Sequence, residues 1–224
     1  MTLFFDDDRH APAREVVLFA DTFNRYFERE NLDDALSVLV AAGYRVYAPL
    51  PADPNERPLC CGRTFLAVGL VEEARREMQR TLDALAPYVK RGIPVIGLEP
   101  SCLLTFRDEL PAMFKGEVAE LLATNARLFE EFIAQEHKQG QLNLRLGPLP
   151  KKALLHGHCH QKALTGTGDA MRLLKQCGDV CEINSGCCGM AGSFGHEREH
   201  YEVSRAIGEQ RLFPAVRDRG DAEI

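Results

Sequence analysis

The 224-residue sequence lacks several features that would place it in a common class of protein. It contains no run of 18 apolar residues, so we predict no membrane-spanning helix. The opening stretch MTLFFDDDRH is acidic and has no apolar centre, unlike a secretory signal peptide, and we expect a disordered leader over residues 1–14. No GxGxxG motif follows the first predicted strand, and no stretch resembles a flavin-binding loop. We therefore expect neither a dinucleotide site nor a flavin site on this chain.

The charge pattern argues against binding to nucleic acid. The formal net charge is −6, and basic residues alternate with acidic ones, as in EEARRE at residues 72–77. Hydrophobic residues make up 45% and charged residues 27%, which is typical of a folded protein. Because no export signal is present, we expect a cytoplasmic protein, with any attachment to the inner membrane made through its partners. In a reducing compartment, the eight cysteines are expected to be metal ligands, redox groups or buried small side chains rather than disulfide partners.

Strand-like and helix-like segments alternate along the chain and predict an α/β fold with parallel sheets and crossover helices. In the first half we predict strands at residues 16–20, 44–48 and 93–98, and helices at residues 32–42, 65–90 and 117–138. In the second half we predict strands at residues 153–157 and 179–183, and helices at residues 169–176 and 196–216. The polar segment 139–152 contains Gly and Pro and is the predicted linker.

The motif Cys-Cys-Gly occurs at residues 60–62 and again at residues 187–189, each time between a strand and a helix. Aligning the halves on this motif brings Gly92 close to Gly220, just before a third strand. Residues 222–224 are then expected to begin the third strand of the second copy. We therefore predict two pseudo-repeated units, residues 15–138 and 153–224, of which the second lacks its last strand and loop.

The cysteines of both motifs lie in loops that follow predicted strands, where ligands bind in open parallel sheets. Thiolates are strong ligands for iron–sulfur clusters and for zinc, and a glycine after the pair lets the backbone approach closely. We predict the best metal site at Cys159, Cys187 and Cys188, and a second site at Cys60, Cys61 and Cys102. Each set is one ligand short of a tetrahedral site. The candidates for a fourth ligand are His158 or His160 in the second copy, and Asp21 or Glu99 in the first.

The sequence resembles the cysteine-rich CCG domain family through its doubled CCG and through DTFNRYFE, LCCGRTFL, GLEPSCLLTFRDEL, GHCHQKAL and GCCGMAGSFGHE. This family includes one of the subunits of heterodisulfide reductase and the iron–sulfur subunits of glycolate, glycerol-3-phosphate and lactate oxidising enzymes. These phrases are most similar to the C-terminal part of fused FAD-linked oxidases of the D-lactate or D-2-hydroxyglutarate dehydrogenase type. The resemblance covers nearly all of residues 16–224.

The resemblance implies a [4Fe–4S] cluster that passes electrons from a flavin, reduced by a 2-hydroxy acid, to a quinone or another acceptor. The FAD would then belong to another domain or subunit. The first copy departs from the family pattern, because Asp21 or Thr22 stands where a lone cysteine is expected and Glu99 opens the CxxC. Two alternatives remain open at this point: a zinc-binding or metal-free scaffold that docks the flavoprotein, and thiol–disulfide chemistry at the CCG pairs.

Overall fold

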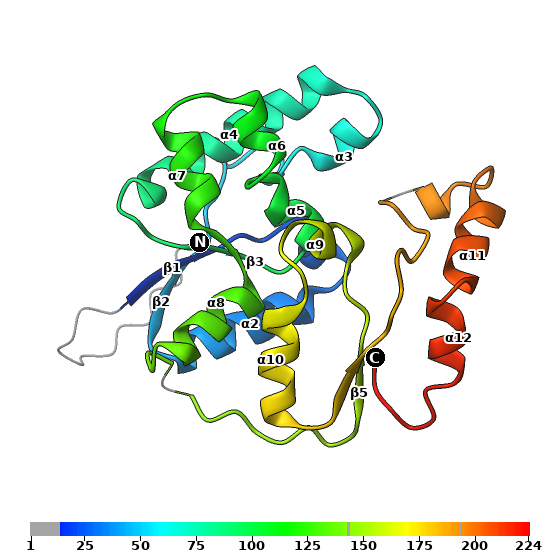
Figure 1. The fold of residues 1–224 in the computed structure, drawn as a ribbon. Coiled ribbons are helices and arrows are strands. Elements are labelled where there is room, and N and C mark those ends of the chain that lie inside the picture. The colour runs from blue at the N-terminus through cyan, green and yellow to red at the C-terminus, as the bar shows by residue number, and fades with distance from the viewer. Residues whose placement is uncertain (1–13, 143, 193) are drawn as a thin grey trace. The chain divides into compact units, whose positions relative to one another are not determined.

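The computed structural model describes residues 14–142, 144–192 and 194–224 (Figure 1). The chain divides between Leu144 and Arg145 into two compact units, called unit 1 and unit 2 below. This division falls within residues 139–152, whose described part contains no helix or strand. The leader predicted for residues 1–14 lies outside the described residues, except that Arg14 begins the first strand.

Unit 1 contains a parallel sheet of four strands, β1 (Arg14–Leu18), β2 (Tyr44–Tyr47), β3 (Val95–Gly97) and β4 (Ala126–Leu128). The spatial order is β2-β1-β3-β4, with every neighbouring pair parallel. Together with the parallel sheet of unit 2, this confirms the predicted α/β class. Because the order reverses beside β1, the loops that follow β1 and β3 diverge there, which is where open α/β sheets bind ligands.

Helices cover both faces of this sheet, which explains why Val16 and Val17 of β1 and Val95 and Ile96 of β3 are fully buried. In Figure 1, α4 (Val71–Val89) and α7 (Glu117–Asn125) lie on one face, and α2 (Arg29–Ala41) and α8 (Phe129–Lys138) lie on the other. The shorter helices of the unit are α1 (Thr22–Tyr26), α3 (Arg63–Ala67), α5 (Pro100–Thr105) and α6 (Glu109–Met113).

For two helices of unit 1, the predicted extent is wrong. The helix predicted over residues 65–90 is broken into α3 and α4 around Gly69, which has a φ of +77°. The helix predicted over residues 117–138 is interrupted by β4. Ala126 and Leu128 of β4 are fully buried beside β3, so pairing with the open edge of β3 outweighs the local helical pattern there.

Unit 2 contains two parallel strands, β5 (Ala153–Leu155) and β6 (Val180–Glu182). Its helices are α9 (Cys159–Leu164), α10 (Gly168–Cys177), α11 (Tyr201–Glu209) and α12 (Leu212–Arg217), with a short 3₁₀ helix at Phe194–His196. The single helix predicted for residues 196–216 is therefore divided into two main pieces. Among the described residues of the whole chain, no helix is both long and apolar enough to cross a membrane.

Glu223 forms a parallel bridge with Ala153 of β5. The Leu154 amide donates to the Glu223 carbonyl at 2.7 Å, and the Glu223 amide donates to the Lys152 carbonyl at 2.9 Å. Glu223 thus pairs with β5 through a single bridge, and a third strand at residues 222–224 stays a prediction. Residue 223 and β6 both pair with β5, as β3 and β2 both pair with β1 in unit 1.

Candidate metal centres

The two Cys-Cys-Gly loops share one backbone geometry. The Gly62 amide donates to the Cys60 Sγ at 3.4 Å, and the Gly189 amide donates to the Cys187 Sγ at 3.3 Å. The two glycines have φ angles of +81° and +90°, which side-chain-bearing residues rarely adopt. The pseudo-repeat seen in the sequence is therefore a repeat of local structure at the proposed ligand loops.

Each glycine also lies against a helix of its own unit. A Cβ at position 62 would lie 2.8 Å from the carbonyl oxygen of Ala74 in α4. A Cβ at position 189 would lie 2.2 Å from the carbonyl oxygen of Ser204 in α11. Only glycine allows this close approach. The packing of Gly62 against α4 and of Gly189 against α11 therefore fixes each cysteine pair near the start of a helix.

The unit 1 cysteines form a chain of thiols at the ends of β2 and β3. The Cys61 thiol interacts with the thiols of both Cys60 and Cys102. Cys61 and Cys102 are buried, with 2% and 5% of their surfaces exposed. The hydrogen bond to Cys61, together with burial, raises the pKa of Cys60, and the bond to Cys102 together with burial raises that of Cys61.

The interaction with Cys61 favours the thiolate of Cys102, but burial and the carboxylates of Asp21 and Glu99 outweigh it and raise the pKa of Cys102. All three thiols of unit 1 therefore hold their protons at neutral pH. A metal that binds here must displace those protons, so its affinity falls as the pH is lowered.

The carboxylates of Asp21 and Glu99 both cap helices. Buried Asp21 accepts hydrogen bonds from the Phe23 and Asn24 amides at 2.9 and 3.0 Å, and from the Asn24 side chain at 2.7 Å. Glu99 accepts from the Ser101 amide at 3.0 Å. Each carboxylate thus has a structural role at the start of α1 or α5, and its role as a metal ligand stays a prediction.

In unit 2, Cys159 is the first residue of α9 and lies next to the CCG loop. Burial, followed by the neighbouring Cys187 thiol, raises the pKa of Cys159, and Cys188 adds to this effect. The amide of Met190 donates to the Cys188 Sγ at 3.5 Å, so two of the three sulfurs of this set accept backbone hydrogen bonds. The structure thus brings together the three cysteines predicted as the best site.

The two histidines predicted as candidate ligands flank Cys159. His158 is the N-cap of α9, and its Nδ1 accepts from the His160 amide at 3.2 Å. Asp21 occupies the same position before α1, which places Thr22, the first residue of α1, as the counterpart of Cys159. Of the two residues suggested for the lost cysteine, the helix starts therefore favour Thr22.

Neither set of three sulfurs has all its members within 4.8 Å of one another. A single tetrahedral zinc ion with Zn–S bonds of about 2.3 Å would hold its sulfurs roughly 4 Å apart. As the side chains stand, both sets are wider than a mononuclear zinc site.

Three residues beside the unit 2 set were not predicted to act together. The Nδ1 of His156 lies 2.7 Å from the Oγ of Ser185, and the Lys162 ammonium donates to the Ser185 carbonyl. Burial lowers the pKa of His156, and the neighbouring Lys162 and His158 lower it further. The sequence offers little signal for this cluster, since Ser185 belongs to no motif and lies 23 residues from Lys162.

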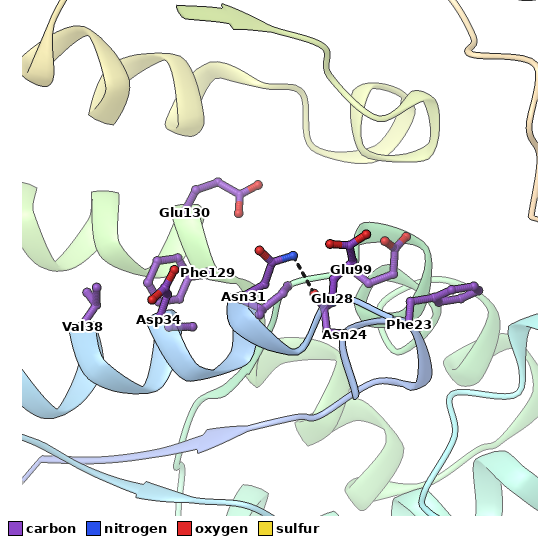
Figure 2. A pocket seen from close by; sticks show the side chains of 11 residues that line it. Phe23, Asn24, Glu28, Asn31, Asp34, Val38, Glu99, Phe129 and Glu130 are labelled. Atoms are coloured by element: carbon purple, nitrogen blue, oxygen red, sulfur yellow. Dashed lines mark hydrogen bonds between the residues drawn. The ribbon is translucent and has the colours of Figure 1, made fainter. Parts of the chain in front are cut away.

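A pocket of about 420 Å³ adjoins Asn24 and Glu99 in unit 1. Figure 2 shows carboxylate side chains around it, together with the hydrogen bond that Asn31 donates to Asn24 at 3.1 Å. These carboxylates belong to Glu28, Asp34, Glu99 and Glu130. Their negative charge opposes the binding of an anion such as a 2-hydroxy acid.

Fold and site together define a two-unit α/β protein with one three-cysteine set at the strand ends of each unit. No protein-family model matches the chain. The chain is similar to a subunit of the anaerobic glycerol-3-phosphate dehydrogenase of Escherichia coli strain K12, with 28% identity over 209 residues, covering 92% of this chain and 50% of that protein.

Two further similarities concern another dehydrogenase and a lactate utilization protein. The D-2-hydroxyglutarate dehydrogenase of Pantoea ananatis is 29% identical over 198 residues, covering 87% of this chain and 18% of that enzyme. Lactate utilization protein A of Bacillus licheniformis is 29% identical over 154 residues, covering 63% of this chain and 60% of that protein. The chain thus spans half the length of the first of these relatives and 18% of the second.

Proposed function

We propose that this chain is the iron–sulfur electron-transfer module of an FAD-linked 2-hydroxyacid oxidoreductase, passing electrons from the flavin to a quinone or another acceptor. The observation that carries the proposal is the set Cys159, Cys187 and Cys188, which comes together at the ends of β5 and β6 with backbone amides donating to two of its sulfurs. The names of the similar proteins support the reaction class.

The donor set suits a [4Fe–4S] cluster, because thiolates are the usual ligands of such clusters and hydrogen bonds to the sulfurs tune the reduction potential. When bound, the cluster would supply one-electron transfer. The three cysteines would hold it, and His158 or His160 would provide the fourth ligand. The amides of Gly189 and Met190 would stabilise negative charge on the sulfurs of Cys187 and Cys188.

Unit 1 is the second candidate site, with Cys60, Cys61 and Cys102 as ligands and Asp21 or Glu99 nearby. We regard residues 15–138 and 153–224 as two copies of one CCG-type unit, of which the second keeps the fuller ligand set. In neither set do all three sulfurs lie as close together as a single zinc ion requires. The raised pKa values of four of the six thiols argue against thiol–disulfide chemistry, which needs an accessible thiolate.

The partner we propose is an FAD-binding oxidase domain or subunit, which would also bind the hydroxy acid. The carboxylate-lined pocket of unit 1 supports this division, because an anionic substrate would be repelled there. We place the protein in the cytoplasm, with contact to the inner membrane made through its partners.

Anaerobic reconstitution with iron and sulfide tests the proposal. Iron and sulfide in about equal amounts, with broad visible absorption that bleaches on reduction, would support it. The Cys187→Ser variant should lose most of the unit 2 iron, whereas Cys181→Ser should not, because Cys181 is an exposed residue of β6. Stoichiometric zinc without iron or sulfide would favour the scaffold alternative and overturn the proposal.

A further inference from the structure

Ser185 uses two of its three polar groups to join the loop before Cys187 to the segment around Cys159, and the third bonds within its own loop. Its amide donates to the Ile183 carbonyl at 2.7 Å, and its carbonyl accepts from the Lys162 ammonium. Its hydroxyl shares a hydrogen bond of 2.7 Å with the Nδ1 of His156. Ser185 is also buried, so each of these bonds would be costly to break.

The partners of Ser185 lie symmetrically about Cys159. His156 is three residues before this cysteine, between β5 and α9, and Lys162 is three residues after it, within α9. Ser185 itself is two residues before Cys187. One buried residue thus connects the strand end, the helix and the CCG loop that carry the three cysteines. We call these three residues, His156, Lys162 and Ser185, the clasp.

The Cys187–Cys188 pair is held from both sides. Gly189 packs against the Ser204 carbonyl after the pair, and Ser185 is bonded before it. Gly186 lies between, and a Cβ there would meet no atom within 4 Å. Because the space beside Gly186 is open, we take Ser185 as the residue that positions the start of the pair.

Unit 1 supplies a comparison within the same chain. Alignment on the helix starts and the CCG motifs places Phe19, Arg25 and Pro58 where unit 2 has His156, Lys162 and Ser185. Phe19 cannot form the side-chain bond, and proline has neither a hydroxyl nor an amide hydrogen. Arg25 donates to the Ala20 carbonyl instead, at 3.3 Å.

Unit 1 also has Thr22 at the position of Cys159. The clasp and the lone cysteine are therefore present together in unit 2 and replaced together in unit 1. A purely structural clasp would be expected wherever the two loops meet. Because the clasp occurs only in the unit with the fuller ligand set, we connect its role with the metal ligands.

We propose that Ser185 is a positioning residue for the unit 2 metal ligands, fixing Cys187 relative to Cys159, and that Lys162 places a positive charge beside the bound cluster. This inference rests on the proposed iron–sulfur function. Partners that orient metal ligands typically change affinity by about 10- to 100-fold when they are removed. A nearby cation stabilises the more negative, reduced state and so raises the reduction potential.

The first experiment compares Ser185→Ala with Ser185→Thr in the reconstituted chain. We expect the alanine variant to lose cluster iron to a chelator about tenfold faster than the unsubstituted chain and to show a changed electron paramagnetic resonance spectrum. The threonine variant keeps the hydroxyl and should restore both. The matched control is Thr81→Val, because the Thr81 hydroxyl donates to the Cys60 carbonyl at 2.7 Å beside the other CCG loop. This control should leave the unit 2 spectrum unchanged.

The second experiment measures the midpoint potential of Lys162→Met and Lys162→Arg. Methionine keeps an unbranched apolar chain without the charge and should lower the potential, whereas arginine should keep it near that of the unsubstituted chain. If Ser185→Ala retains the original loss rate and spectrum, or if both Lys162 variants share one potential, the clasp inference fails while the cluster assignment stands. If the unsubstituted chain takes up no iron that depends on Cys187, the proposed function fails first.

Discussion

The amide nitrogen of Gly189 lies 3.3 Å from the Sγ of Cys187, with the glycine at a φ of +90°. Gly62 and Cys60 reproduce this relationship in unit 1, at 3.4 Å and +81°. The sequences after the two glycines differ, so the shared geometry comes from the Cys-Cys-Gly motif and from the helix against which each glycine packs. The sulfur of the first cysteine is thereby turned toward a backbone donor in both units.

Replacing Gly189 with alanine should destabilise unit 2. The positive φ costs an L-residue about 1–2 kcal/mol, and the new Cβ would meet the Ser204 carbonyl oxygen, so we expect a total loss of about 2 kcal/mol or more. Gly62→Ala should destabilise unit 1 in the same way. Urea denaturation followed by circular dichroism measures both effects.

Gly186→Ala is the control for these variants. It introduces the same methyl group into the same loop, but Gly186 has no positive φ and a Cβ there meets no atom within 4 Å. Its free energy of unfolding should change by less than about 0.5 kcal/mol. Equal losses for Gly186→Ala and Gly189→Ala would show that the close approach to α11 is unimportant.

The raised pKa values of the buried thiols predict slow alkylation of the unit 1 set. Only the thiolate reacts with iodoacetamide, so Cys60, Cys61 and Cys102 should react far more slowly at pH 7.5 than exposed Cys181. Mass spectrometry after timed alkylation of the chain without added metal measures the rate at which each cysteine reacts. Rapid modification of Cys61 at pH 7.5 in the folded protein would contradict it.

The same thiols make the stability of unit 1 depend on pH. Unfolded cysteine has a pKa of about 8.5, and the folded values are higher, so the folded state binds more protons above that pH. Their contribution is fully present below about pH 8.5 and is lost as the pH rises toward the folded pKa values. Without added metal, unit 1 should therefore unfold more easily at pH 10 than at pH 8, and Cys61→Ala should reduce this difference.

The sequence pattern predicts β1, β2 and β3, because residues 16–20 and 93–98 are short apolar runs and residues 44–48 alternate like a strand. It does not predict β4, since residues 126–128 lie within a helical pattern and become a strand only by pairing with β3. The cysteines of both sets could be predicted because their motif repeats. The Ser185 clasp could not, because contacts between residues 23 and 29 positions apart depend on the tertiary fold.

Asp21 stabilises unit 1 as the N-cap of α1. Asp21→Ala would leave the Phe23 and Asn24 amides without their acceptor, and Asn24 is buried. We expect a loss of about 2 kcal/mol in the free energy of unfolding. Asp21→Asn keeps one acceptor oxygen for the amides and should lose less. If Asp21 acts as a metal ligand as well, Asp21→Asn should lower metal uptake by unit 1 more than it lowers stability.

The helix starts also predict which single substitution would restore a fourth ligand to unit 1. Thr22 is the first residue of α1, as Cys159 is of α9, so Thr22→Cys should place a thiol beside Cys60 and Cys61. We expect this variant to increase the iron retained by unit 1, measured in a Cys187→Ser background that disables unit 2.

Asp21→Cys is the matched comparison, since it adds the same thiol one position earlier but removes the cap. It should lower stability without increasing iron. If Asp21→Cys gains iron and Thr22→Cys does not, the lost ligand position is residue 21, and the equivalence of Thr22 with Cys159 is wrong.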